Sequence, residues 1–335
     1  MVAPSKQQTT RQRAQTGDGQ VSHPVRNITV DLECAGQRVD NFILARCKGM
    51  PRSHAYRLLR TGQVRVNGGR VKPPHRLCEG DLVRLPPVRI KSDVVPGAGA
   101  VASVLRTLEG QVLFEDSRLL ILNKPAGIAV HGGSGIKVGI VEALRELRSD
   151  LRQVELVHRL DRGTSGCLLL AKRRSALRAL HEQFRAGTVE KRYLALGRGQ
   201  LSEPKQRVSA PLLKIERGGE HMVVVSPEGR ESISHFRANR VYSNATLMEV
   251  LLETGRTHQI RAHANHIGLP LAGDEKYGDP EFNRKMAKIG LRRLFLHARS
   301  LRFTHPGDGQ VITQNAPLPD TLKQLMKKLE SDLIE

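Results

Sequence analysis

The sequence lacks tryptophan, and aromatic side chains make up 3% of its 335 residues. This composition counts against single-strand binding by stacking of many bases, and any stacking must come from a few individual residues. No apolar run approaches the ~20 residues of a membrane span, and the N-terminus lacks the apolar core of a secretion signal. We expect a cytoplasmic protein that does not enter a membrane.

Metal-binding patterns are missing as well. The four cysteines form neither a C-x-x-C pair nor a zinc spacing, so we expect free thiols in a reducing compartment. His258, His263 and His266 have spacings of five and three, not the four of a zinc pair on one helix face. We therefore expect no metal and no other cofactor.

Acidic residues are scarce relative to basic ones. The chain has 54 lysines and arginines against 33 aspartates and glutamates, a formal net charge of +21. Residues 1–90 alone hold 16 basic and 6 acidic side chains. Each phosphate that a basic side chain neutralises releases counterions, so this excess favours a nucleic acid as partner. The alternative is a charged tail or a solubility feature.

The N-terminal quarter has the pattern of a tail followed by a small domain. Residues 1–25 are polar and basic and predict a disordered tail. We expect an ordered domain over residues 26–90. Apolar side chains at helical spacing from Val39 to Ile43 predict its first helix.

A second helix is expected between Ser53, as its N-cap, and Gly62. Its inward side would carry Ala55, Tyr56, Leu58 and Leu59. The Asn67-Gly68 pair between two alternating stretches then predicts a hairpin.

This arrangement resembles the S4 RNA-binding module over residues 36–85. The matching stretches are Gln37-Arg38-Val39-Asp40 and Gly62-Gln63-Val64-Arg65-Val66-Asn67-Gly68. The resemblance implies that arginines follow an RNA backbone by charge and shape. The expected RNA contacts are Arg38, Arg52, Arg57, Arg60, Arg65 and Arg70. The alternative is an ordinary small domain with solvated arginines.

Residues 91–108 have the composition of a linker, and residues 109–335 predict a second domain. In this domain strands often follow one another without a helix between them, which indicates a largely antiparallel sheet and an α+β fold. Strands are expected at 111–114, 118–122, 167–172, 192–197, 221–226, 232–238 and 245–252. Helices are expected at 138–148, 175–186, 258–267 and 319–330.

The most informative stretch is His158-Arg159-Leu160-Asp161-Arg162-Gly163-Thr164-Ser165-Gly166. It places a carboxylate between two arginines, in a turn directly before an apolar run that predicts a buried strand. Flanking positive charge favours the ionised form of Asp161. Considered alone, Asp161 could equally belong to a structural ion pair.

Two further stretches contain side chains that could join Asp161. One is Lys191-Arg192-Tyr193-Leu194-Ala195-Leu196, a strand whose alternation puts Tyr193 on the opposite face from Arg192. The other runs from Thr254 to Arg261, where a strand ends and a helix is expected to open at Thr257. Arg261 in its first turns could hold a carboxylate with a fork of donors.

Together these three stretches resemble the RluA family of pseudouridine synthases, over nearly the whole chain. Supporting stretches are Leu122-Asn123-Lys124-Pro125-Ala126-Gly127, Val130-His131-Gly132-Gly133 and Leu294-Phe295-Leu296-His297-Ala298. The S4-like front end, the linker and His305-Pro306 look most like the RluC-type branch, which acts on bacterial 23S (large-subunit) ribosomal RNA. The implied architecture is a small S4-like α/β domain followed by a mainly antiparallel, mixed-sheet catalytic domain.

The resemblance also implies roles for individual residues. Asp161 matches the catalytic aspartate, Tyr193 the aromatic that packs on the target base, and Arg261 the partner of the aspartate. Arg159 matches the arginine that fills the gap left by the extruded uridine. Gly163 is a departure, since close relatives often have an acidic residue at this position.

The implied reaction breaks the N1–C1′ bond of uridine, turns the base and joins C5 to C1′. It needs an ionised carboxylate at the ribose, acting either as a nucleophile at C1′ or as a base at C2′. A base within a helix cannot turn, so the nucleotide must be extruded at a cost of a few kcal/mol. Stacking on Tyr193 would recover on the order of 1–3 kcal/mol of this cost.

Other catalytic classes fit less well. His158, Asp161 and Ser165 lie within one short loop and can rarely converge as a hydrolase triad. The loop of Gly132-Gly133-Ser134-Gly135 lacks the ending of a phosphate-binding motif, and a glycosidase would need two opposed carboxylates. We expect a monomeric RNA-modifying isomerase. The alternative is a non-catalytic S4-type RNA-binding or ribosome-assembly factor.

Overall fold

The computed structural model describes residues 15–16, 20–47, 50–91, 98–132, 138–217 and 220–331. The chain divides into two compact units, Met1–Ala98 and Gly99–Glu335. Residues 1–14 and 17–19 of the expected tail lie outside the described residues, and the described part of this tail contributes to two short strands. Of the helices that the structure describes, none combines the length and apolar composition needed to cross a membrane.

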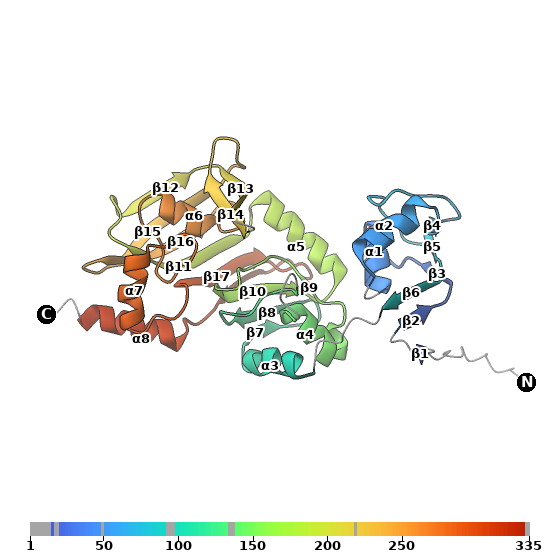
Figure 1. The fold of residues 1–335 in the computed structure, drawn as a ribbon, viewed down its shortest axis with the longest axis horizontal. Helices are drawn as coiled ribbons and strands as arrows, with labels where there is room; N and C mark the ends of the chain where they lie inside the picture. Colours follow the sequence, from blue (N-terminus) through green and yellow to red (C-terminus); the bar gives the residue numbers. More distant parts are fainter. Residues whose placement is uncertain are drawn as a thin grey trace, which may run out of the picture. The chain divides into compact units, whose positions relative to one another are not determined.

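The first unit packs two helices against small antiparallel sheets (Figure 1). Its helices are α1 (Val39–Arg46) and α2 (Arg52–Arg60), preceded by the 3-10 helix η1 (Leu32–Cys34). Its strands are β1 (Gln15–Thr16), β2 (Gln20–His23), β3 (Arg26–Thr29), β4 (Arg65–Val66), β5 (Leu82–Leu85) and β6 (Val88–Lys91). They form sheets of order β1-β2-β6 and β3-β5-β4. Val39, Phe42 and Ile43 are buried in the unit's core, which confirms the first helix.

The start of α2 and the orientation of Tyr56 differ from the prediction. Helix α2 begins at Arg52, with Pro51 rather than Ser53 as its N-cap. The Tyr56 side chain points outward and is 37% exposed. Its hydroxyl donates to the carboxylate of Asp40 on α1, and this polar partner draws the ring away from the apolar core.

The Asn67-Gly68 turn is present, but its strands pair differently. Asn67 and Gly68 have φ of 50° and 78°, the left-handed values of a tight hairpin turn. Val66 bridges Gly69 across this turn, yet the ladder partner of β4 is β5 and not the residues that follow the turn. The Asn67 side chain joins the turn to β5 by accepting the N–H of Leu82.

The linker prediction needs a correction, because Ala98–Leu108 form helix α3. Val101 and Leu108 are buried in two different apolar clusters, and Val104 packs against both. These residues recur at helical spacing, so burial of one side stabilises a helix despite the small residues at its start. Residues 92–97 lie outside the described part.

The second unit is built on a mixed ten-stranded sheet, mostly antiparallel, which confirms the predicted fold class. The main path of this sheet has the order β12-β15-β16-β11-β17-β10-β8-β7, with β18 beside β17 and β9 beside β10. Strands β10 and β17 are parallel. The strands on the main path are β7 (Val112–Glu115), β8 (Leu119–Lys124), β10 (Ser165–Ala171), β11 (Glu190–Arg198), β12 (Lys205–Ser209), β15 (Ile233–Val241), β16 (Ala245–Leu252) and β17 (Leu296–Thr304).

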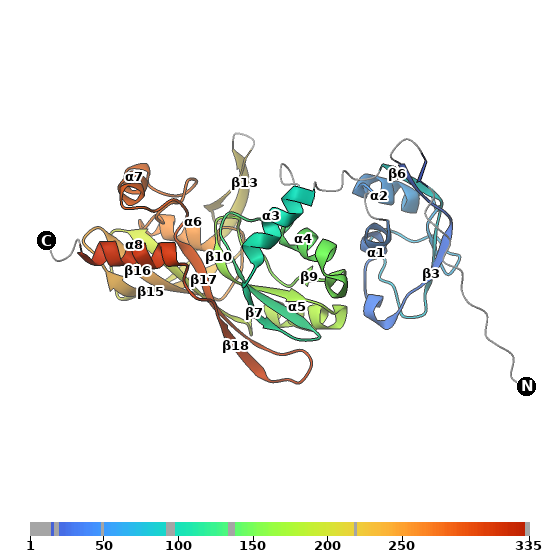
Figure 2. The same ribbon diagram turned by 90° about the horizontal axis from the view of Figure 1, so that it is seen from below.

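Four further strands lie outside the main path of this sheet. Strand β9 (Glu155–Leu156) adds to β10, and β18 (Val311–Asn315) forms a long ribbon with β17, seen in Figure 2. Strands β13 (Leu212–Arg217) and β14 (Glu220–Val225) make a separate hairpin.

Helices bury both faces of the central strands. Leu168 and Leu170 of β10 lie in one core, which also contains side chains of α4 (Ile140–Leu147) and α6 (Gln259–His266). Cys167 and Leu169 point into the opposite core with α5 (Arg174–Ala186). Burial on both faces explains the continuous apolar run. The remaining helices are α7 (Pro280–Lys288), α8 (Asp320–Ser331) and the 3-10 helix η2 (Ser149–Leu151).

Candidate active site

Asp161 lies in a turn at the N-terminal end of β10, as predicted. The N–H of Thr164 donates to the carbonyl of Asp161 at 3.1 Å and closes the turn. The backbone N–H of Gly127 donates to the carbonyl of Arg162, and Nε of Arg162 donates back to the carbonyl of Gly127, both at 2.8 Å. Hydrogen bonds within the turn and to the backbone at Gly127 therefore restrain the backbone that carries the carboxylate.

Two cations support this turn, the buried Lys124 and the half-buried Arg293. The Lys124 ammonium, with none of its surface exposed, donates to the carbonyls of Pro125, Arg162 and Thr164 at 2.9, 3.3 and 2.8 Å. Nη2 of Arg293 donates to the carbonyl of Gly163 and to the Ser165 hydroxyl. Burial and, to a smaller extent, the Arg293 charge lower the pKa of Lys124 to about 7, although the Asp161 charge opposes this shift.

Helix α6 brings Arg261 to the same place. Gln259 anchors its first turn: the side-chain amide donates to the carbonyl of Ile233, and its oxygen accepts the N–H of Arg256. The helix begins at Gln259 and not at Thr257 as expected, because His258 adopts a left-handed backbone with φ 54°. This conformation costs a non-glycine residue energy and is found where a side chain must be aimed.

Arg261 is shared between two aspartates, and its stronger partner was not predicted. Nε and Nη2 donate to Asp274 at 2.7 and 2.8 Å, while Nη1 donates to Asp161 at 3.3 Å. Burial alone would raise the pKa of Asp274, but the bonds and charge of Arg261 hold it below its usual value. Two of the three guanidinium nitrogens thus bind Asp274, and the third is directed at Asp161.

A second chain of hydrogen bonds points His258 at Asp161. The N–H of Val223 donates to the Tyr277 hydroxyl at 2.8 Å, so the hydroxyl hydrogen is available to Nδ1 of His258, 2.9 Å away. This leaves the proton of the neutral imidazole on Nε2, which faces Oδ2 of Asp161 at 3.7 Å. Burial lowers the pKa of His258 and favours this neutral form.

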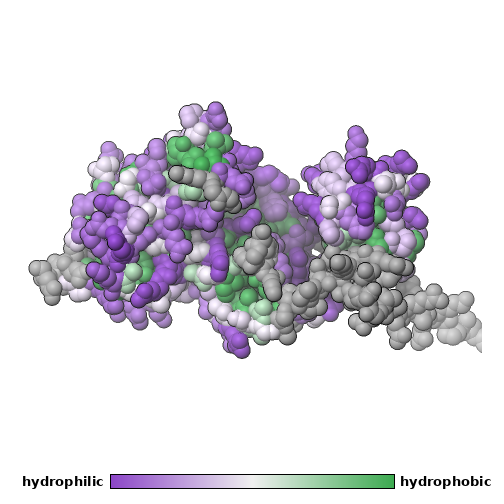
Figure 3. Space-filling model, in the orientation of Figure 1, coloured by the Kyte–Doolittle hydropathy of each residue, from purple (hydrophilic) through white to green (hydrophobic). Residues whose placement is uncertain are grey.

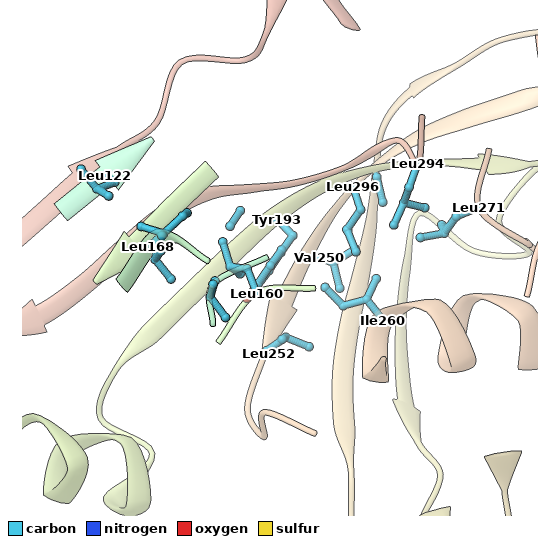
Figure 4. Close-up of a cluster of buried hydrophobic side chains, with 14 of the residues drawn as sticks. Leu122, Leu160, Leu168, Tyr193, Val250, Leu252, Ile260, Leu271, Leu294 and Leu296 are labelled. Atoms are coloured by element: carbon cyan, nitrogen blue, oxygen red, sulfur yellow. The ribbon is translucent and has the colours of Figure 1, made fainter. Parts of the chain in front are cut away.

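The four residues matched to the catalytic family surround one cleft. Asp161, Arg159, Tyr193 and Arg261 all line it. Tyr193 packs among Leu160, Val250 and Leu252 in the apolar core and is 8% exposed (Figure 4). A base entering the cleft would therefore meet a rigidly held ring.

The competing catalytic arrangements are not formed. Nε2 of His158 accepts the N–H of Leu169, and Ser165 instead contacts His297 at 2.9 Å, so no triad converges on Asp161. His263 is satisfied in the core by Ser234 and a backbone carbonyl. No three or more metal-ligating side chains cluster suitably within the described ranges. Most of the Gly132–Gly135 loop lies outside those ranges.

The six arginines predicted to contact RNA have different environments in the first unit. Arg38 pairs with Asp40, and Arg65 donates to the carbonyls of Gly62 and Gly68. The other four line one hollow on the unit: Arg52, Arg57, Arg60 and Arg70.

Comparison with known proteins connects this site to a family. A model described as RNA pseudouridylate synthase matches residues 118–266, and an S4 domain model matches residues 37–83. The chain is 51% identical over 310 residues to ribosomal large subunit pseudouridine synthase C of Pasteurella multocida (strain Pm70), covering 92% of this chain and 95% of that relative. The chain belongs to the RNA pseudouridylate synthase family.

Other members of the family extend the comparison. The synthase C of Escherichia coli (strain K12) is 49% identical over 92% of this chain and 97% of its own length. The solved structure of human RNA pseudouridylate synthase domain containing 4 has a TM-score of 0.57 at 24% identity, covering 69% of this chain and 97% of that one, and shows the shared fold. Both resemblances noted in the sequence, to the synthases and to the S4 module, are confirmed.

Sequence reasoning missed four residues of the site in this pseudouridine synthase family member, Lys124, Asp274, Tyr277 and Arg293, and considered a fifth, His258, only as a metal ligand. A charged residue at the end of an apolar strand is a signal that could have identified Lys124. For Asp274, Tyr277 and Arg293, the local pattern contains no such signal, because their roles depend on contacts across the fold.

Proposed function

We propose that this chain converts uridines of large-subunit (23S) ribosomal RNA to pseudouridine, with Asp161 as the catalytic group. The observation that carries the proposal is the position of Asp161. Its carboxylate lines a cleft beside Tyr193 and faces Arg261 and His258. The turn that carries it is held by hydrogen bonds from Lys124 and Arg293. Relatives at about 50% identity that are named for the large ribosomal subunit support the choice of RNA.

The proposed residues divide the reaction between them. The target uridine leaves its helix and packs against Tyr193, while Arg159 occupies the vacated place. Asp161 acts at the ribose, at C1′ or C2′, while the N1–C1′ bond breaks and C5 joins C1′. The C5 hydrogen leaves as a proton to water, and N1 takes one up, so no other atom enters or leaves. Arg261 holds the carboxylate in place inside the cleft through its Nη1.

The S4 unit is proposed to hold the RNA through Arg38, Arg52, Arg57, Arg60, Arg65 and Arg70. All proposed catalytic residues come from one chain, which supports a monomer as the active form. A ribosomal RNA substrate also supports action in the cytoplasm.

Tritium release from RNA labelled at uridine C5 tests the proposal, because the label leaves only when C5 becomes bonded to carbon. We expect release with the unaltered chain and background with Asp161→Asn, while RNA affinity stays within about threefold. Asp320→Asn makes the same chemical change at an exposed aspartate and should release label normally. RNA binding without tritium release by the unaltered chain would instead indicate the non-catalytic factor.

A further inference from the structure

A basic hollow opens on the first unit, beside α2. It has a volume of about 1010 Å³, and one aromatic ring lies among its cations. The lining residues that matter here are Arg52, Arg57, Arg60, Arg70, Lys72 and Tyr56. None of the five cations pairs with a carboxylate among the described residues. Arg52 donates to the amide oxygen of Asn41 at 3.4 Å. Their charges are available to a ligand.

The Tyr56 ring is fixed at this hollow by a buried acid. Its hydroxyl donates to Oδ2 of Asp40 at 3.0 Å. Asp40 is 1% exposed and also accepts Arg38 at 2.7 and 3.1 Å and the N–H of Asn41. Burial would raise the pKa of Asp40, but these bonds together lower it, so it remains an acceptor. One end of the ring is therefore anchored while 37% of the side chain stays exposed.

We propose that this hollow binds an unpaired nucleotide of the RNA, with its base stacked on Tyr56 and the flanking phosphates on the surrounding arginines. The inference rests on the proposed function, which makes RNA the ligand. A base inside a duplex has both faces covered by its neighbours and cannot stack on a side chain, whereas an unpaired base can. Free guanidinium groups beside the ring provide the phosphate contacts.

Charge complementarity favours RNA, and the ring favours a base over a bare phosphate chain. The face of the first unit visible in Figure 3 is largely hydrophilic, as expected of a surface that meets a polyanion. Stacking depends little on which base is present. This hollow would therefore distinguish unpaired from paired nucleotides and would not select a particular base.

The test uses the full chain and two short single-stranded RNAs of otherwise uridine sequence. One carries 2-aminopurine at its centre, and the other has an abasic ribose there. We expect the unaltered chain to bind the base-carrying strand at least about fivefold more tightly and to quench its fluorescence. Tyr56→Leu should abolish both the preference and the quenching. Tyr56→Phe keeps the ring without the Asp40 bond and should retain most of the preference.

Two matched variants separate this hollow from other contacts. Tyr193→Leu makes the same change in the catalytic cleft and should leave the base preference in place. Arg57→Gln should keep the preference but reduce the salt slope of binding by about 0.7, the value for one phosphate of a single strand. Retained preference and quenching in a folded Tyr56→Leu chain would overturn the proposal, as would equal binding of the abasic strand by the unaltered chain.

The proposed function is measured separately in the same preparations. Tritium release at saturating RNA depends on Asp161 and not on the hollow, so its absence in the unaltered chain would count against the catalytic proposal alone. Release by Tyr56→Leu, together with a lost base preference, is the combination that both proposals predict.

Discussion

Arg261 grips Asp274 with two of its nitrogens, at 2.7 and 2.8 Å, and reaches Asp161 with the third. The guanidinium is thus held by one carboxylate and offered to another. Its cationic carbon also lies 4.9 Å from the centre of the Tyr277 ring, which restrains the group from a third direction. Rigid support of this kind is what a catalytic carboxylate needs from its partner.

Asp274→Asn should therefore reduce catalysis although Asp274 does not line the cleft. The amide cannot accept both Arg261 nitrogens as a carboxylate does, so Arg261 would turn toward Asp161 and misplace it. We expect single-turnover tritium release to slow by roughly 100-fold with little change in RNA affinity. Glu281→Gln alters an exposed pair with Lys285 and should change neither rate nor melting temperature. A normal rate in folded Asp274→Asn would contradict this role.

Tyr277→Phe tests the hydrogen bonds that orient His258. Without the hydroxyl, Nδ1 loses its donor, so the neutral imidazole is less favoured and the pKa of His258 should rise. Asp161, Asp274, Arg261 and Lys276 also act on this imidazole and remain in place. We expect kcat to fall about tenfold with KM unchanged, and the acid limb of the pH–rate profile to move to higher pH. An acid limb that does not move would show that the protonation of His258 does not affect the reaction at Asp161.

Two glycines near Asp161 should respond in opposite directions to alanine. A Cβ on Gly163 would meet Leu294 at 3.5 Å, an ordinary contact. Gly163→Ala should therefore stabilise the fold by about 0.4–1 kcal/mol, because alanine lowers the conformational entropy of the unfolded chain. Gly166 has φ of 111°, and a Cβ there would lie 2.2 Å from the carbonyl oxygen of Ala298. Gly166→Ala should cost more than about 2 kcal/mol. Thermal melting measures both, and a shared direction would contradict the geometry.

Acid should destabilise the fold through two histidines, the buried His297 and the half-buried His158. Burial lowers the pKa of both His158 and His297 to about 4, against 6.5 for an exposed histidine. Between pH 6.5 and 4 the unfolded chain therefore binds more protons than the folded one, and stability falls as pH falls. This stabilising contribution is fully present above pH 6.5 and lost below about 4. Denaturant unfolding across this range should show it.

His297→Asn is the matching variant for that measurement. In this variant about one proton fewer should be taken up on unfolding between pH 6.5 and 4, so the unfolding free energy should depend less steeply on pH. An unchanged slope would mean that His297 is already protonated in the folded chain.

Much of the fold followed from local pattern. The apolar run after Ser165 predicted β10, and residues 175–186 predicted α5 almost to its ends. Strand β17, at the centre of the sheet, was missed as a strand even though its first residues were noted in the resemblance. Helix α3 was taken for a linker because small residues at its start conceal the apolar side that packs on the core.

The chemical groups of this protein could be predicted from the sequence alone: a carboxylate in a tight turn, an arginine at a helix start, an aromatic on a strand and a basic N-terminal region. These follow from residue type and local spacing, which act over a few positions. Which of these charges come into contact depends on the tertiary fold. Arg261 reaches Asp274 13 residues away and Asp161 100 residues away, and such contacts depend on how the sheet brings distant strands together.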